Sequence, residues 1–114
     1  MKQLYAQGDL LIERVPDIPV PGVAARSDER SPLVLAEGET TGHRHAIYDR
    51  AVMFRDDGLA SDVPDGLYIG HVRVEDACAR VTHEEHAPVT LPKGTYRVRR
   101  QRELDLWDPS VIAD

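Results

Sequence analysis

The spacing of apolar residues constrains the fold of this chain most strongly. Apolar and polar residues alternate with a period of two, most cleanly over residues 67–74, which is the repeat of a β-strand with two different faces. No window of eleven or more residues carries the period of an amphipathic helix. Eight Gly and eight Pro residues interrupt the alternation throughout the chain. The pattern therefore predicts an all-β chain of short strands.

We expect about seven to nine short strands, because strands bounded by turn residues that recur about every 8–12 residues are typical of small all-β domains. The expected strands lie within residues 10–15, 33–36, 43–48, 51–55, 67–74, 77–82, 89–91 and 95–104. Pro92-Lys93-Gly94 is interpreted as the turn between the last two strands. This number and spacing of strands predict a β-sandwich or a small barrel.

The length of 114 residues predicts one domain, residues 1–114, with residues 105–114 as a C-terminal tail. The tail is expected to form a short helical turn or to lie along the domain with Trp107 packed against it. No apolar run is long enough for a signal peptide or a membrane span, so we expect a soluble cytoplasmic protein without membrane contacts. Cys78, between two alanines, is expected to be reduced and buried.

The charge balance argues against general nucleic-acid binding. Asp and Glu number 20 against 14 Lys and Arg, a net charge of −6, which repels a phosphate backbone. A local exception is the segment Arg97 to Arg102, in which four of six residues are arginines. We interpret it as a solvated edge strand protected from edge-to-edge pairing. Internal ion pairs, or binding of a phosphate or carboxylate partner, remain open as alternatives.

Four of the five histidines form two pairs. His43 and His45 lie at positions i and i+2 of an expected strand. Such residues project from one face, so their imidazoles lie side by side. His83 and His86 have the spacing i and i+3, which brings them together in a turn or a single helical turn. The helical zinc-protease motif does not match, because its spacing is one residue longer. The fifth histidine, His71, lies among apolar residues and is expected to be a half-buried core side chain.

In a sandwich or barrel the two histidine pairs can face each other and share one transition-metal ion, with zinc as the expected ion. We expect His43, His45 and His86 as ligands and His83 as a fourth ligand or a neighbour. With one Cys in the chain, such a site rests on imidazole and carboxylate. A separation of more than about 10 Å between the pairs would exclude it, since Zn–N bonds measure about 2.0–2.1 Å.

Carboxylates beside the histidines suggest what such a site does. Glu84 or Glu85 is the expected catalytic base on a metal-bound water, with Glu39 as a weaker candidate. Metal-dependent hydrolysis of a small or phosphorylated substrate is therefore the leading hypothesis. Two alternatives stay open, so whether the protein is an enzyme is undecided. One is a non-enzymatic homo-oligomeric binding or assembly module, and the other is a metal-free enzyme with histidines as acid and base.

The first histidine pair resembles the first motif of the cupin superfamily, which carries a glycine, then His-x-His, then a carboxylate. The residues in a similar order here are Gly38, His43, His45 and Asp49. The second cupin motif has Pro-x-Gly followed by a ligand histidine, and Arg97 stands at that position after Pro92-Lys93-Gly94. His83 or His86 would then supply the ligand. The resemblance implies a cupin-like, jelly-roll-like fold.

A closer resemblance covers nearly the whole chain. The segments that carry it are Gln7-Gly8-Asp9, Gly42-His43-Arg44-His45, His83-Glu84-Glu85-His86, Leu91-Pro92-Lys93-Gly94-Thr95-Tyr96 and Arg100-Gln101-Arg102-Glu103. In combination they resemble a family of small bacterial and phage proteins. That family is uncharacterised, so the resemblance implies no activity.

Overall fold

The computed structural model describes residues 3–28, 30–38, 41–101 and 111–113. These ranges contain nine strands and one short 3₁₀ helix, η1 (Asp57–Ala60), so the all-β expectation is confirmed. The strands are β1 (Leu4–Gln7), β2 (Leu10–Val15), β3 (Ala25–Arg26), β4 (Leu33–Glu37), β5 (Arg44–Ile47), β6 (Ala51–Phe54), β7 (Tyr68–Thr82), β8 (Val89–Arg100) and β9 (Val111–Ala113).

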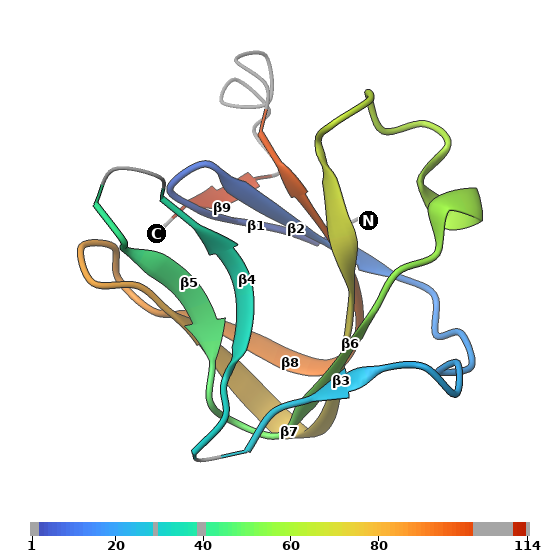
Figure 1. Ribbon diagram of the computed structural model, residues 1–114, viewed down its shortest axis with the longest axis horizontal. Helices are drawn as coiled ribbons and strands as arrows, with labels where there is room; N and C mark the ends of the chain where they lie inside the picture. The colour runs from blue at the N-terminus through green and yellow to red at the C-terminus, as the bar shows by residue number, and fades with distance from the viewer. Residues whose placement is uncertain (1–2, 29, 39–40, 102–110, 114) are drawn as a thin grey trace.

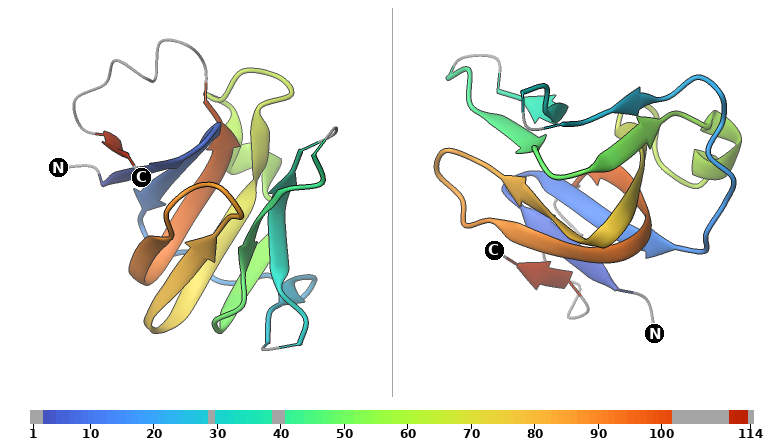
Figure 2. Two further views of the ribbon diagram at one scale, coloured as in Figure 1. Left: turned by 90° about the vertical axis from the view of Figure 1, so that its left-hand side faces the viewer. Right: turned by 90° about the horizontal axis from the view of Figure 1, so that it is seen from below.

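The nine strands form one curled sheet (Figure 1). The main path runs β3-β6-β7-β8-β2-β1-β9, and β5 joins β7 beside it and carries β4. All pairs are antiparallel except β1 with β9. Figure 2 shows the β7–β8 hairpin between β1–β2 on one side and β4–β5 on the other. Among the described residues no ladder joins β4 to β9, so the sheet is curled without closing into a barrel.

The β7–β8 hairpin is longer than the sequence predicts. Pro92-Lys93-Gly94 is not a turn, because β8 runs through it, with Pro92 opposite Cys78 and Gly94 opposite Val74. The register shift between Val74 and Cys78 is a bulge in β7, which bends the strand. Gly94 has φ +152°, a conformation that favours glycine, and it adds to the bend. These irregularities let β7 pair first with β6 and then with β5.

The core fills the inside of the curl and comes from nearly every strand. Tyr96 of β8 is its largest fully buried side chain and contacts the ring of Tyr5 edge-to-face, with centroids 6.2 Å apart. Burying each large apolar side chain stabilises the fold by about 1.5–3 kcal/mol. His71 is 1% exposed and bonds the hydroxyl of Tyr68, so its expected core position is confirmed.

The interpretation of Arg97 to Arg102 as a solvated edge strand is wrong. β8 lies between β7 and β2, and Arg97 and Arg99 are buried against the carboxylate of Glu13 on β2. Arg97 also binds Asp62, with Nη1 and Oδ1 2.6 Å apart. The alternative of internal ion pairs is therefore the one that the structure supports for these arginines; Arg102 lies outside the described residues.

Two further expectations concern Cys78 and the tail. Cys78 is exposed rather than buried, because Ala79 and Val81 face the core and Cys78 therefore projects from the other face of β7. Of residues 105–114, only 111–113 are described, and they form β9 beside β1. Trp107 lies outside the described residues.

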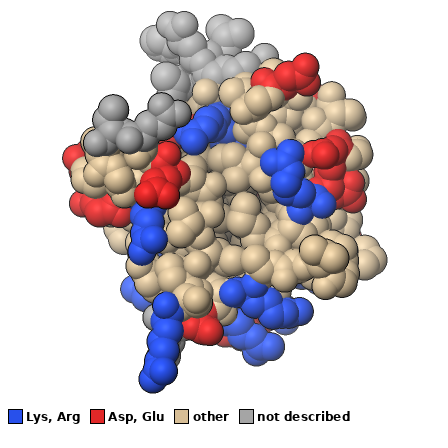
Figure 3. Space-filling model, in the orientation of Figure 1, with Lys and Arg blue, Asp and Glu red and all other residues tan. Residues whose placement is uncertain are grey.

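The surface shows no single dominant charge on the face seen in Figure 3. Uncharged residues occupy the centre of that face, and charged residues of both signs lie around its rim. Within the described residues, no helix has the length and apolar character needed to cross a membrane.

Candidate functional site

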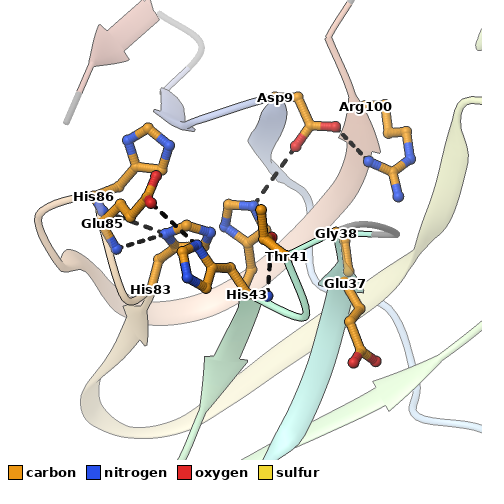
Figure 4. A pocket seen from close by; sticks show the side chains of 11 residues that line it. Asp9, Glu37, Gly38, Thr41, His43, His83, Glu85, His86 and Arg100 are labelled. Atoms are coloured by element: carbon orange, nitrogen blue, oxygen red, sulfur yellow. Dashed lines mark hydrogen bonds and ion pairs between the residues drawn. The ribbon is translucent and has the colours of Figure 1, made fainter.

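The two histidine pairs line one pocket of about 200 Å³ (Figure 4). It lies where the β1–β2 turn, the loop between β4 and β5, and the β7–β8 loop meet. The ring centroids of His45 and His83 are 4.4 Å apart, and those of His83 and His86 are 4.7 Å apart. The pairs therefore lie closer together than the separation of about 10 Å that would exclude a shared site. The remaining lining residues are Asp9, Ala36, Glu37, Gly38, Thr41, Glu85 and Arg100.

His45 is the most enclosed of the four histidines, with 5% of its surface exposed. It lies on β5, and its Nδ1 is 2.8 Å from Oε1 of Gln7 on β1. The amide nitrogen of Gln7 donates to the backbone oxygens of Val81 and Ala87, at 2.9 and 3.0 Å. Those two bonds fix which end of the amide is the oxygen. His45 must therefore donate from Nδ1, and its Nε2 carries a lone pair.

The lone pair of His45 faces a carboxylate. Nε2 lies 3.6 Å from Oδ1 of Asp9 in the β1–β2 turn. Burial, followed by an electrostatic contribution from His83, lowers the pKa of His45 to about 4, so the ring is neutral at pH 7. A lone pair and an anionic oxygen then point at each other with no proton between them. A cation placed between the two groups removes that repulsion.

His83 has a different role. Its Nδ1 accepts hydrogen bonds from the backbone N–H groups of Glu85 and His86, at 3.0 and 3.3 Å. These bonds close the turn that the i, i+3 spacing predicts. A neutral imidazole that accepts at Nδ1 holds its proton on Nε2. In this arrangement His83 shapes the β7–β8 loop, and a metal ion would have to displace these two bonds to reach Nδ1.

Two glutamates follow His83 and differ in position. Both oxygens of Glu84 accept from the backbone N–H of Arg44, at 3.2 and 2.9 Å, and this bond lowers the pKa of Glu84. Glu85 points into the pocket in Figure 4, with Oε1 3.4 Å from Nδ1 of His43. Ligand atoms of His43, His83 and Glu84 also lie within 4.8 Å of one another.

Several residues beside the histidines are not marked by any local sequence pattern. Gln7, Gly8 and Asp9 stand out in the sequence only through the family resemblance, yet all three contact the histidines. A Cβ on Gly8 would lie 2.8 Å from Nε2 of His86 and 3.3 Å from Cε1 of His45, so only glycine leaves room for both rings. Arg100 binds Asp9 from the end of β8. No local pattern marks these contacts, because they join segments distant in sequence.

Two residues of the cupin resemblance, Asp49 and Arg97, lie outside the histidine pocket. Asp49 accepts from the backbone N–H of Arg80 at 2.8 Å and lines a separate pocket with Cys78. Arg97 is occupied by its ion pairs with Glu13 and Asp62. Glu39 lies outside the described residues.

Residues 6–101 match the model of a family described as Domain of unknown function (DUF8820). The chain belongs to this family. The matched region contains every histidine and carboxylate of the pocket described above. No curated protein and no solved structure matches the chain.

Proposed function

We propose that the histidine pocket binds a transition-metal ion, with zinc as the first expectation, through His43, His45 and His86. The observation that carries the proposal is the state of His45. It is neutral, its Nδ1 is occupied by Gln7, and its Nε2 lone pair faces the carboxylate of Asp9. Histidine ligands in metal sites are typically held in this way by a second residue on the other ring nitrogen.

The rest of the pocket supports a cation over an anion. Asp9, Glu37 and Glu85 line it, against one positive side chain, Arg100, which is already bound to Asp9. The rings of His45 and His86 are parallel with centroids 6.4 Å apart. A shared ion therefore requires the half-buried His86 to turn toward His45, a movement within the exposed β7–β8 loop.

We further propose that a bound ion serves hydrolysis of a small or phosphorylated substrate. A zinc ion lowers the pKa of bound water to about 7 and so supplies a nucleophile. Of the two glutamates, Glu85 is the better base, because it lines the pocket. Glu84 is held by Arg44 on the strand beside it.

Metal titration of the tag-free, chelator-treated protein tests the binding step. We expect about one equivalent of zinc or another transition metal, since the pocket offers one set of ligands. His45→Gln should weaken binding at least tenfold, while Glu75→Gln, an exposed residue far from the histidines, should not. Less than about 0.2 equivalents bound by the folded protein would contradict the proposal.

A further inference from the structure

A second pocket, of about 270 Å³, shares no residue with the histidine pocket. Its lining consists of Val15, Pro16, Ile18, Leu59 and His71. Four of these residues are apolar and partly exposed; Leu59 is 41% exposed. The fifth, His71, is polar and 1% exposed. A buried polar group among partly exposed apolar side chains is typical of a binding site for a small molecule.

Hydrogen bonds from the sheet hold both walls of this pocket. Nη1 of Arg97 donates to the backbone oxygen of Leu59 in η1 at 3.1 Å. Nη1 of Arg73 donates to the backbone oxygen of Ile18 at 2.9 Å, in the loop after β2. The neighbouring Asp17 accepts from Oγ1 of Thr95, also at 2.9 Å. The pocket is therefore preformed, so a ligand does not have to order its walls.

The imidazole of His71 offers a hydrogen-bond donor to the pocket. The Tyr68 hydroxyl accepts from the backbone N–H of Asp56 at 3.0 Å, and it lies 2.6 Å from Nδ1 of His71, a position from which it can donate to that nitrogen. Burial, followed by the charge of Arg97, lowers the pKa of His71, which favours the neutral ring. With Tyr68 as the donor to Nδ1, the neutral ring holds its one proton on Nε2.

The Nε2–H group of His71 has no hydrogen-bond partner among the described residues, and surrounding atoms do not enclose it completely. Among the described residues the only enclosed side-chain polar atom without a partner is Oε1 of Gln101. Because His71 lines the pocket and Nε2 is not among the enclosed atoms without a partner, the geometry points to Nε2 as the ring atom that faces the pocket.

The arginines of β8 near His71 are paired with carboxylates. Arg97, directly opposite His71 in the ladder, is paired with Glu13 and Asp62, and Arg99 is paired with Glu13. These two arginines are therefore paired with carboxylates and do not attract an anionic ligand. An uncharged ligand therefore fits this surrounding best.

We propose that this pocket binds a small, uncharged and largely apolar molecule with one hydrogen-bond acceptor, such as a ketone, which accepts from Nε2–H of His71. The volume of about 270 Å³ lies just below the usual range for ligand pockets, about 300–1,000 Å³, so the ligand is compact. The site is independent of the metal pocket.

Cyclohexanone is a suitable probe, and cyclohexylammonium, a ring of similar size with a charged donor, is its control. Titration in the presence of a chelator should shift the side-chain ¹⁵N signal of His71 and the methyl signals of Ile18 and Leu59, saturating at a millimolar dissociation constant. Cyclohexylammonium should produce no saturable shift. Long-range ¹⁵N–¹H spectra of the free protein should show the proton of His71 on Nε2.

Ile18→Trp fills the pocket and should weaken cyclohexanone binding at least tenfold. Val23→Trp, at a position 91% exposed and outside the pocket, should bind as the unchanged protein does. Leu59→Ser removes an exposed wall without burying new bulk and should also weaken binding, which keeps the test valid if Ile18→Trp misfolds. Non-saturable shifts, equal binding of the two probes, or a proton on Nδ1 of His71 would each overturn the proposal.

Discussion

The side-chain amide of Gln7 determines which nitrogen of His45 carries the proton. Its Oε1 lies 2.8 Å from Nδ1 of His45, while its nitrogen bonds the backbone oxygens of Val81 and Ala87. One fully buried glutamine thus ties β1 to β5, β7 and the β7–β8 loop. It also leaves Nε2 of His45 directed at Asp9 with its lone pair available.

Gln7→Leu should destabilise the fold and weaken metal binding together. The variant leaves Nδ1 of His45 and two backbone oxygens without partners, at a cost of about 1–3 kcal/mol for a buried unsatisfied group. Loss of the residue that orients a ligand typically weakens metal affinity by about 10–100-fold. Urea unfolding in chelator and zinc titration measure the two effects. Gln3→Leu, at an exposed glutamine that bonds Arg14, is the control and should change neither.

The free energy of unfolding should fall as the pH drops below neutrality. The pKa of His45 is lowered from 6.5 to about 4 in the folded protein, so the unfolded chain binds the proton more tightly. The stabilisation is complete above pH 6.5, decreases toward pH 4, and is lost below it, up to about 3 kcal/mol. Burial lowers the pKa of His71 as well, with the same sign.

Urea unfolding in chelator at pH 7, 5.5 and 4 would measure this dependence. His45→Gln should show a shallower decrease than the unchanged protein, because glutamine does not titrate. Identical pH profiles for the two proteins would refute the role assigned to His45.

Gly8→Ala should disturb the histidine pocket beyond the strain of its backbone. Gly8 has φ +57°, where a residue with a Cβ costs about 1–2 kcal/mol, and the new Cβ would lie 2.8 Å from Nε2 of His86. Gly66→Ala is the matched control, because Gly66 has φ +82° and nothing within 4 Å of its Cβ position. Only Gly8→Ala should shift the NMR signals of His45 and His86 and weaken zinc binding.

Glu13→Gln should be among the most destabilising single changes in the sheet. Glu13 is 3% exposed and pairs with both Arg97 and Arg99. Removing one partner from a buried ion pair costs about 3–5 kcal/mol. Glu75→Gln removes the exposed ion pair with Arg26 and should cost less than about 1 kcal/mol. Similar midpoints of thermal unfolding for the two variants would contradict the buried network.

Local alternation identified most of the strands, because the two-residue period depends only on the chain itself. The expected strand at residues 10–15 coincides with β2, and those at 33–36 and 51–55 differ from β4 and β6 by one residue. The sequence pattern predicted a turn at Pro92-Lys93-Gly94, and this prediction was wrong, because these turn-forming residues lie inside β8. There the partner strand, with its bulge, decides whether the chain continues or turns.

The sequence alone determined the all-β class and placed four of five histidines in two short segments that a β fold can bring together. Only the tertiary structure decided that β8 lies inside the sheet, which buries Arg97 and Arg99 against Glu13. It also decided that Gln7, Gly8 and Asp9 meet the histidines, and that His83 closes a turn. The physical reason is that strand pairing and register join residues far apart in the chain, and these contacts set burial, proton position and partner for each side chain.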